Sequence, residues 1–374
     1  MAENILLLTY WYPSNSNKSS GIFIKRHAAA IHLINNVVVV SLHITDGRSI
    51  FKKTSEITKD ENNVETHQVC IASRYRKLVY LLLPVHYFIL RKYLRRQLCE
   101  HKFSTVHSNV IFPCAIVGHY LSKKMRCRHI ITEHWTKIDK FFSISLYRFA
   151  GKIAFDRANA ITCVSESLAA TVKKYTDNKN VTIIPNVIDP NEFYFNPAIQ
   201  KNRKLTFIAA AHWAQFKNPF YFLDALELIY HEKQIPEFKV ALAGTGEQLS
   251  VIRQKNYHFE ISYLGAMDVK GLNTEFNRSH VFLHGSDFET FSVVIAEALM
   301  CGLPCVVSPV GIGPEVIHSG NGFVTNNTVS DWKQKILLCC ASNYDHAAIS
   351  EQLKHKFDLA TVGRQFKDLY SSLV

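Results

Sequence analysis

The segment VFLHGSDFETFSVVIAEALMCGLPCVV, residues 281–307, contains a strand, a polar loop, a helix and the start of a second strand. The apolar run at its beginning predicts a buried strand, and the apolar stretch from about Ser292 predicts a helix. Gly302 follows this helix, and Pro304 prevents its continuation. A strand followed by a helix and another strand indicates a parallel pair with the helix on one face of the sheet.

The same alternation of apolar strands and longer helix-like stretches continues along the whole chain. The predicted strands lie at residues 4–11, 36–44, 105–112, 128–135 and 160–165 in the first half and at residues 204–213, 238–244, 258–265, 281–286 and 304–310 in the second. Continuous apolar strands indicate parallel sheets that helices cover on both faces. The predicted fold class is therefore α/β, with two doubly wound, Rossmann-like domains.

The chain of 374 residues is too long for one ordinary hydrophobic core, so two domains are expected. Residues 183–197 are rich in proline and asparagine and poor in helix-forming residues, which is typical of a linker. We therefore predict one domain at residues 1–188 and a second at residues 189–355. Residues 356–374 are expected to form a helix that packs back on the first domain.

The composition is globular, with 47% hydrophobic and 20% charged residues. The nine cysteines are scattered and have no partner histidines at zinc-binding spacing, which favours free, mostly buried thiols in a reducing compartment. The first residues lack the basic, apolar and small-residue pattern of a signal peptide. These features lead us to expect a cytoplasmic protein.

The net charge of +12 is concentrated in the first half of the chain. Residues 1–190 contain 27 Lys and Arg against 13 Asp and Glu, and no acidic residue lies between Glu65 and Glu100. Within this gap, seven cations flank a 13-residue apolar run. The run is too short to span a membrane, which takes about 20 apolar residues.

This basic window, residues 73–99, has two interpretations. It forms either a surface that lies on an anionic membrane, at the inner face of the cell membrane, or a buried helix with a solvated basic flank. Nucleic acid also binds basic faces, but no nucleic-acid motif accompanies this one, so nucleic acid is not expected as a partner.

Polar residues follow several predicted strands, where doubly wound sheets bind their ligands. His212 and Lys217 precede a helix that is expected to begin near Pro219. Gly244 and Gly246 lie between a strand and the next helix, although a lone G-x-G is often only a tight turn. These positions are candidates for ligand binding. The simpler interpretation is that they are ordinary loop residues exposed to solvent.

Glu289 and Glu297 lie eight residues apart around the start of the helix in the opening segment. Two acidic residues at this spacing occur by chance in a chain of this size. Whether they form a binding site therefore depends on the residues around them. The backbone amides of Phe291, Ser292 and Val293 lie at a helix N-terminus, which is a natural phosphate site. Carboxylates on either side of it would suit a sugar–diphosphate–ribose ligand, each accepting hydrogen bonds from hydroxyl groups.

The segment at residues 288–317 resembles the glutamate–seven–glutamate signature of the family four retaining glycosyltransferases, which have the GT-B fold. Four more segments resemble family motifs in the family's order. They are YWYPSNSNKSSGIFIKRHAAAI with Gly21 in a cleft-facing position, ITEHW with His134, PNVIDPNEF between the domains, and AHWAQFKN with Lys217. The resemblance covers most of the chain and implies two domains that face a cleft.

The resemblance implies a role for each matched residue. The first domain would bind the acceptor, and the second would bind the nucleotide sugar. Glu289 would hold the donor sugar's hydroxyls, Lys217 would neutralise the leaving diphosphate, and His134 would line the sugar pocket and support the oxocarbenium-like transition state. Glu297 would bind the ribose. The remaining donor-binding positions would be Gly21, His212, Gly244, Gly246, Phe291, Ser292 and Val293.

No cofactor or metal is expected, because the chain has no Asp-x-Asp pair to bridge a metal to the diphosphate. A lysine and a helix N-terminus can stabilise the departing charge instead. Three residues depart from the family pattern. His212 stands where arginine is usual and is only partly charged at neutral pH, and Thr290 and Ser292 stand where glycines are usual.

The expected function is retaining transfer of a hexose-type sugar from a nucleotide-diphosphate sugar to a glycan or lipid-linked acceptor, in surface polysaccharide synthesis. Two alternatives remain open. The chain could be a nucleotide-sugar epimerase of the same fold, which would not need a basic, apolar face for a lipid-linked acceptor. It could also be a non-catalytic member that binds sugar.

Overall fold

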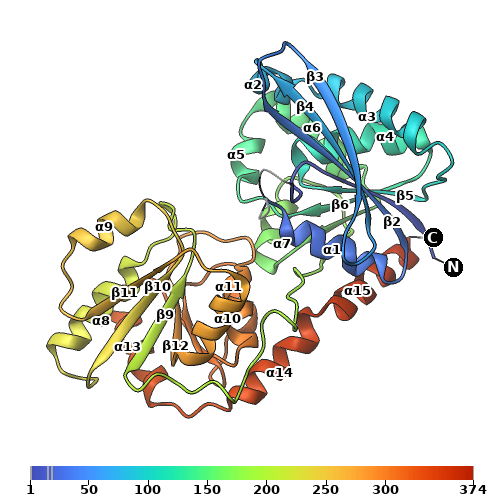
Figure 1. The fold of residues 1–374 in the computed structure, drawn as a ribbon. Coiled ribbons are helices and arrows are strands. Elements are labelled where there is room, and N and C mark those ends of the chain that lie inside the picture. Colours follow the sequence, from blue (N-terminus) through green and yellow to red (C-terminus); the bar gives the residue numbers. More distant parts are fainter. Residues whose placement is uncertain (1, 15–16, 18–19, 374) are drawn as a thin grey trace. The chain divides into compact units, whose positions relative to one another are not determined.

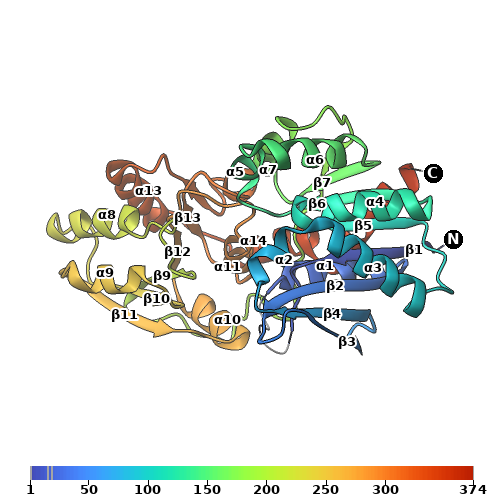
Figure 2. The ribbon, with the colours of Figure 1, turned by 90° about the horizontal axis from the view of Figure 1, so that it is seen from above.

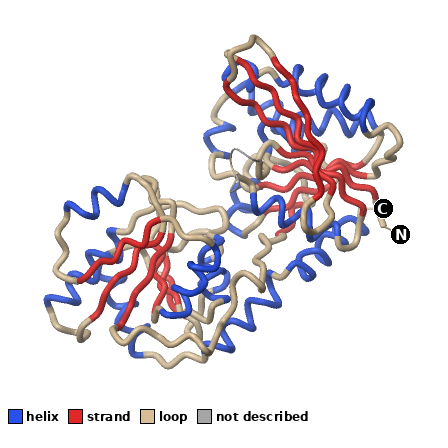
Figure 3. The backbone as a smooth tube through the Cα atoms, viewed as in Figure 1, coloured by secondary structure: helices blue, strands red, loops and turns tan. Residues whose placement is uncertain are grey.

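The computed structural model of the chain describes residues 2–14, 17 and 20–373, and it divides into two units (Figure 1). The first unit comprises Met1–Val187 with Leu359–Val374, and the second comprises Ile188–Asp358. Each unit has one sheet with helices packed on it (Figure 3). The predicted α/β fold with two Rossmann-like units is therefore confirmed. Four residues of the predicted first loop, Asn15, Ser16, Lys18 and Ser19, lie outside the described residues.

The first unit contains an eight-stranded sheet in the order β3-β4-β2-β1-β5-β6-β7-β8. The strands are β1 (Asn4–Thr9), β2 (Asn36–Asp46), β3 (Lys52–Lys59), β4 (Glu65–Ser73), β5 (Thr105–Asn109), β6 (Arg128–Glu133), β7 (Ala160–Cys163) and β8 (Val181–Ile183). All neighbours are parallel except β3 and β4, which form an antiparallel pair at the edge. In the centre, Leu7 of β1 lies between Val39 and His107.

Alternate side chains of each strand pack on opposite faces of this sheet. The helices of the unit are α1 (Ile22–His32), α2 (Arg76–Leu81), α3 (Leu83–Gln97), η1 (Ile111–Ala115), α4 (Ile116–Met125), α5 (Ile138–Phe142), α6 (Ser145–Asp156), α7 (Glu166–Lys173) and α15 (Leu359–Ser372). Ile5 and Leu7 belong to a core with α1 and α15, whereas Leu6 and Leu8 belong to a core with α2, α3 and α4. α3 and α4 lie side by side over this second core (Figure 2). Because helices cover both faces of the sheet, the sequences of its central strands are continuous apolar runs.

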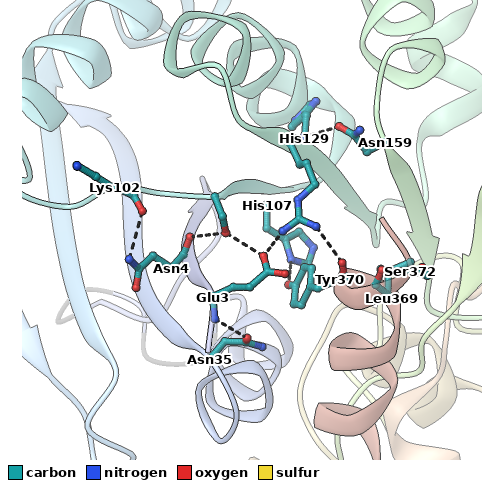
Figure 4. Close-up of polar contacts among 12 residues, drawn as sticks. Glu3, Asn4, Asn35, Lys102, His107, His129, Asn159, Leu369, Tyr370 and Ser372 are labelled. Atoms are coloured by element: carbon teal, nitrogen blue, oxygen red, sulfur yellow. Dashed lines mark hydrogen bonds and ion pairs between the residues drawn. The ribbon is translucent and has the colours of Figure 1, made fainter. Parts of the chain in front are cut away.

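The last helix, α15, joins the first unit although it follows the whole second unit in sequence. It packs along α1, where Gly363 allows contact with the backbone of Ala30. The Tyr370 hydroxyl lies 2.6 Å from Nδ1 of the buried His107 (Figure 4). Arg128, paired with Glu3, donates to the Tyr370 carbonyl at 2.9 Å. These contacts attach the C-terminal helix to the central strands.

The second unit contains a fully parallel six-stranded sheet in the order β11-β10-β9-β12-β13-β14. The strands are β9 (Leu205–Ala210), β10 (Phe238–Ala243), β11 (Glu260–Gly265), β12 (Val281–His284), β13 (Cys305–Val307) and β14 (Gly322–Val324). The helices are α8 (Phe220–His231), α9 (Gln248–Gln254), α10 (Val269–Arg278), α11 (Val293–Met300), α12 (Gly313–Val316), α13 (Val329–Ala341) and α14 (His346–Phe357). The strand order changes direction between β9 and β12, which is the switch point where such sheets bind ligands.

Two helix pairs stabilise the second sheet. α8 and α13 pack side by side over a core that includes Phe222, Leu226 and Trp332 (Figure 2). α11 packs on α14, and His346 Nδ1 lies 2.7 Å from the Gly302 carbonyl at the end of α11. This packing fixes both helices that begin near the switch point, α8 and α11.

All nine cysteines are free, and Cys114, Cys163, Cys301, Cys305 and Cys339 are buried, in line with the expectation of mostly buried thiols. None of the helices in the described part of the chain combines the length and the apolar character needed to cross a membrane.

Candidate active site

Two loops of the second unit bring Lys217 and Glu289 into contact. Lys217 lies between β9 and α8, and Glu289 lies between β12 and α11. Because β9 and β12 are parallel neighbours, the loops that follow them are adjacent, and the Asn218 amide donates to the Gly285 carbonyl at 3.0 Å. The Lys217 ammonium donates a hydrogen bond to Glu289 Oε1 in an ion pair. The sequence placed both residues after strands, but only the structure reveals their contact.

The Lys217–Glu289 pair is largely shielded from water, and each side chain is 13% exposed. Burial lowers the pKa of Lys217 to about 8, because the ammonium loses hydration. The lysine is therefore charged at neutral pH in a site of low dielectric constant, where electrostatic interactions are strong.

His284, the last residue of β12, lies beside this pair and was not identified from the sequence. It is 3% exposed, and its Nε2 lies 3.3 Å from Glu289 Oε1. Neither ring nitrogen has a hydrogen-bond partner among the described residues. Burial, and then the charge of Lys217, hold the pKa of His284 well below its usual value, so the ring is neutral. In the sequence, its position at the end of a predicted strand could have marked it as a candidate site residue.

The N-terminus of α11 lies at the other side of Glu289. Ser292 precedes the helix in the left-handed conformation, with φ 70° and ψ 68°, and its side chain makes no cap hydrogen bond. The Ser292 hydroxyl is buried without a hydrogen-bond partner in the described residues. This conformation favours glycine, the residue that the resemblance noted in the sequence leads us to expect at this position. The first backbone amides of α11 are therefore free of a side-chain cap.

The other residues of the glutamate motif have distinct surroundings. Phe291 is buried against Phe357, with ring centroids 5.7 Å apart, and its carbonyl accepts from the Ile312 amide at 2.8 Å. A Cβ on Gly311 would lie 2.5 Å from the Phe291 carbonyl oxygen, so only glycine permits this approach. Val293 and Glu297 of α11 are half-buried. Phe291 thus anchors the loop, whereas Val293 and Glu297 are partly accessible.

The loop with Gly244 and Gly246 packs against the backbone next to His212. Both glycines have positive φ, 105° and 149°, and a Cβ on Gly246 would lie 2.4 Å from the Trp213 carbonyl oxygen. The Trp213 amide donates to the Thr245 carbonyl at 2.8 Å. The glycines therefore allow the loops after β9 and β10 to pack together. The His212 side chain is exposed, unlike that of Lys217.

The predicted residues Gly21 and His134 belong to the first unit. Gly21 begins α1 with φ 65°, and a Cβ there would lie 2.2 Å from the Trp11 carbonyl oxygen. His134 follows β6 and is buried; its ring lies 4.7 Å from that of Phe23, and its Nε2 lies 3.3 Å from Asn109 Oδ1. Burial, more than the nearby histidines, holds the pKa of His134 well below its usual value. Its ring is therefore neutral.

Glu133, also not identified from the sequence, positions the backbone at His134. It is fully buried at the end of β6 and accepts hydrogen bonds from the amides of Ile111 at 2.8 Å, His134 at 2.9 Å and Trp135 at 2.8 Å. Burial raises the pKa of Glu133 to about 7, although the three amides act against this rise. An acidic residue at the end of a buried strand was the signal that could have identified it.

Comparisons with known families match both units. The profile described as Glycosyltransferase Family 4 matches residues 37–192, and the profile described as Glycosyl transferases group 1 matches residues 202–342.

Three curated relatives are similar to part of the chain. N-acetyl-alpha-D-glucosaminyl L-malate synthase of Bacillus anthracis is 27% identical over 58% of this chain and 59% of that protein. One subunit of phosphatidylinositol N-acetylglucosaminyltransferase of Homo sapiens is 27% identical over 60% of this chain and 47% of that protein. UDP-Gal:alpha-D-GlcNAc-diphosphoundecaprenol alpha-1,3-galactosyltransferase of Escherichia coli is 26% identical over 54% of this chain and 56% of that protein. The chain spans about half the length of these relatives.

Solved structures resemble the whole chain. Sucrose-phosphate synthase from Thermosynechococcus elongatus has a TM-score of 0.75 at 15% identity and covers 99% of both chains. HepE of Anabaena in complex with UDP and glucose has a TM-score of 0.72 at 16% identity, over 99% of this chain and 100% of that chain. At these identities the likeness shows the fold alone. Because the two family profiles together match residues in both units and the fold is that of GT-B enzymes, this chain belongs to the family four glycosyltransferases.

Proposed function

We propose that this protein is a retaining glycosyltransferase that moves a hexose-type sugar from a nucleoside-diphosphate sugar to a glycan or lipid-linked acceptor in surface polysaccharide synthesis. The observation that carries the proposal is the buried Lys217–Glu289 pair beside the N-terminus of α11, which has no side-chain cap. A cation, a carboxylate and free amides at one edge of the sheet match a ligand with a diphosphate and sugar hydroxyls.

Lys217 and the amides at the start of α11 would stabilise the leaving group. Negative charge builds up on the diphosphate as the glycosidic bond breaks, and buried donors of fixed orientation stabilise such charge. This arrangement supports transfer without a metal ion. Glu289 accepts from Lys217 in the structure. Donor binding would place the diphosphate near the lysine and leave Glu289 free to accept from the sugar hydroxyls.

The same proposed donor suggests roles for the remaining residues. Glu297 would bind the ribose, and His212 would contribute to diphosphate binding. Transfer would proceed on the front face of the donor sugar, with the departing phosphate helping to deprotonate the acceptor. In the first unit, the neutral ring of His134 would contact the sugar and would not supply a positive charge.

The names of the curated relatives guide the choice of donor and acceptor. Two of them name N-acetylglucosaminyl transfer, and one names UDP-Gal with a diphosphoundecaprenol acceptor. We therefore infer a UDP-linked hexose or N-acetylhexosamine as the donor and a lipid-linked glycan as the first acceptor to test.

The basic window supports a peripheral position on an anionic membrane, at the inner face of the cell membrane. It forms α2 and α3 at the surface of the first unit, and α3 buries only part of its circumference: His86, Leu90, Tyr93 and Leu94. Large apolar side chains remain exposed within the basic window and, at Ile50 and Phe51, before the edge strand β3. They are Ile50, Phe51, Tyr75, Leu78, Leu81, Leu82 and Phe88, the last at 61% exposure.

Cations converge beside these apolar side chains. An open pocket of about 510 Å³ is lined by Phe88, Arg91, Lys92, Arg95 and Arg96. The pKa of Lys53, on the neighbouring edge strand β3, is lowered by burial and then by the charges of Lys92 and Arg96. Lys53, Lys92 and Arg96 thus place several positive charges close together, which favours an anionic partner.

We infer that this surface, α2, α3 and the segment at Ile50 and Phe51, rests on the headgroups of an anionic membrane. Exposed leucine side chains among the cations favour a membrane over nucleic acid, whose phosphates and bases gain little from aliphatic side chains. Such a surface would bring the enzyme to a lipid-linked acceptor. The protein would otherwise remain in the cytoplasm.

A panel of nucleoside-diphosphate sugars, tested by thermal shift and then by product analysis, examines the proposed function. Glycosyl transfer, or slow donor hydrolysis that releases nucleoside diphosphate, supports a glycosyltransferase. Interconversion of nucleotide sugars without release of diphosphate would identify an epimerase. Binding without any turnover would identify a non-catalytic member and would refute the proposal.

A further inference from the structure

Three side chains with metal-binding atoms meet at the C-terminal end of α8. Glu227 and His231 are one helical turn apart on α8, at positions i and i+4. His258 comes from the segment that leads from α9 into β11. The potential ligand atoms of all three residues lie within 4.8 Å of one another. Residues from two separate parts of the chain therefore present two imidazoles and one carboxylate to the same point.

The contacts within this cluster centre on the glutamate. His231 Nε2 lies 3.2 Å from Glu227 Oε1, and His258 Nδ1 contacts the same oxygen. The amide of His258 donates to Glu227 Oε2 at 3.1 Å. The two imidazole rings lie 4.7 Å apart at an interplanar angle of 66°. Both rings therefore already point their nitrogens at one carboxylate oxygen.

Neighbouring contacts fix the backbone on both sides of the cluster. Asp224, one turn before Glu227, accepts from Lys255 Nζ at 2.9 Å and from the Tyr257 hydroxyl at 2.6 Å. These contacts hold the segment with His258 against α8. The ligand side chains keep freedom to adjust, because those of His231 and His258 are 53% and 60% exposed. The cluster thus combines a fixed backbone with side chains that can turn toward an ion.

Two imidazoles and a carboxylate form a ligand set that suits Zn²⁺. Zinc binds imidazole nitrogen and carboxylate oxygen at about 2.0–2.2 Å, usually with four ligands in a tetrahedron. Ligand atoms of a tetrahedral site are then about 3.3–3.6 Å apart, by simple geometry from these bond lengths. The separations in the cluster need only small rotations of exposed side chains to reach this range, and water can occupy the fourth position.

We propose that Glu227, His231 and His258 form a Zn²⁺ site that pins the segment before β11 to α8. The site lies at the opposite end of α8 from Lys217. The helix has 12 residues, which corresponds to about 18 Å. The ion is therefore a stabilising element of the second unit and has no part in the chemistry at Lys217 and Glu289. This inference is independent of the proposed function.

The test is titration of the full-length, metal-free and untagged protein with zinc chloride, followed by calorimetry and thermal unfolding. Imidazole binds metal in its neutral form, so the buffer should be slightly above neutral pH. We expect one equivalent of zinc to bind and to raise the unfolding temperature, and a chelator to reverse this rise. His258→Asn and His231→Asn should each weaken zinc binding at least tenfold. Glu227→Gln should also weaken zinc binding, and it removes the charge of the carboxylate while nearly keeping the shape of the side chain.

His355→Asn provides a matched control. His355 pairs with Glu351 at the same i,i+4 spacing on α14, with 3.0 Å between the nitrogen and the oxygen, but this pair is not part of a three-ligand group among the described residues. It should leave zinc binding unchanged. The proposal is overturned if no zinc binds, or if His258→Asn and His355→Asn have the same effect. It is also overturned if the variants of Glu227, His231 and His258 lower stability equally with and without zinc. That result would show that these residues form an ion pair and do not bind zinc.

Discussion

Lys217 and Glu289 form an ion pair although 72 residues separate them in the sequence. The contact exists because β9 and β12 are neighbours at the switch point of the second sheet, so the loops that follow them are adjacent. Each partner holds the other in place, and His284 completes the group from the strand end. The polar groups of the site therefore orient one another, which reduces the cost of ordering them when donor binds.

The charge of Lys217 leads to a prediction about pH. Burial holds the pKa of this lysine at about 8, so the positive charge is present below that pH and is lost as the pH rises through it. Nucleoside diphosphate affinity should therefore begin to fall near pH 8, and it should level off at the higher pKa that bound diphosphate gives to the lysine. Lys217→Arg keeps its charge at high pH and should flatten the profile. Identical profiles for the two proteins, measured by calorimetry, would refute the role of Lys217.

The conformation of Ser292 leads to a prediction about stability. Its φ of 70° is unfavourable for a residue with a side chain. Ser292→Gly should raise the free energy of unfolding by about 0.5–1 kcal/mol, measured by urea denaturation. Ser250→Gly is the matched control, because Ser250 has a helical conformation in α9, where glycine is unfavourable. A loss of stability in Ser292→Gly similar to that of the control would show that the serine is not strained.

The membrane surface can be tested with vesicles. Replacing Arg91, Lys92, Arg95 and Arg96 with glutamine should lower sedimentation with anionic vesicles at least tenfold, because each cation near such a surface contributes about 1 kcal/mol. Binding should also weaken as salt rises, since charges are screened over about 8–10 Å near physiological ionic strength. Donor hydrolysis should be spared, because the altered residues are far in sequence from the donor motifs.

A control variant with the same loss of charge replaces exposed lysines of the second unit, Lys233, Lys270, Lys354 and Lys356, with glutamine. It should sediment like the unaltered protein. Phe88→Ser removes the most exposed aromatic side chain of α3 and should weaken binding even at low salt. Unchanged vesicle binding by the quadruple arginine and lysine variant would contradict the membrane surface, and retention of DNA by that surface would indicate nucleic acid instead.

Chelation separates the two claims about metal. Sugar transfer should continue in excess EDTA, because in the proposed mechanism Lys217 and the start of α11 stabilise the leaving group. The same EDTA should lower the unfolding temperature, because it removes zinc from Glu227, His231 and His258. Loss of transfer on chelation, restored by Mg²⁺ or Mn²⁺, would contradict the metal-independent mechanism without bearing on the zinc site.

The sequence predicted the sheets because their central strands are continuous apolar runs. It did not predict β4, which lies between β3 and β2. It also did not predict β3, whose eight residues are polar or isolated apolar side chains and are all exposed. This strand forms only because β4 offers it an antiparallel edge. The strands β8 and β14 have three residues each and are too short to give a periodic signal.

The candidate site was predictable where a residue stands in a loop after a strand, as Lys217 and Glu289 do. His284 and Glu133 were missed although each is the last residue of a buried strand, because that position makes a polar residue a candidate but only its neighbours show whether it belongs to a site. The basic window likewise had two interpretations, because the local sequence does not show which of its side chains are buried. Whether Phe88 is buried depends on the elements beside it, which the sequence does not specify locally.

Glu297 should act on the nucleotide and not on the sugar. Glu297→Ala is therefore expected to weaken nucleoside diphosphate binding about 10- to 150-fold, as measured by calorimetry, because a hydrogen-bonded carboxylate contributes about 1.5–3 kcal/mol. Nucleotide affinity equal to that of the unaltered protein would show that the ribose is bound elsewhere.

The most direct measurement is the comparison of turnover and nucleotide affinity in Glu289→Gln. This variant keeps the shape of the side chain but loses the charge that pairs with Lys217 and that, in the proposed mechanism, accepts hydrogen bonds from the donor sugar. Nucleoside diphosphate release from the preferred nucleotide sugar should fall more than tenfold, whereas nucleoside diphosphate affinity should stay nearly unchanged, because the contact is to the sugar. Turnover equal to that of the unaltered protein would contradict the assignment of the Lys217–Glu289 pair as the donor site.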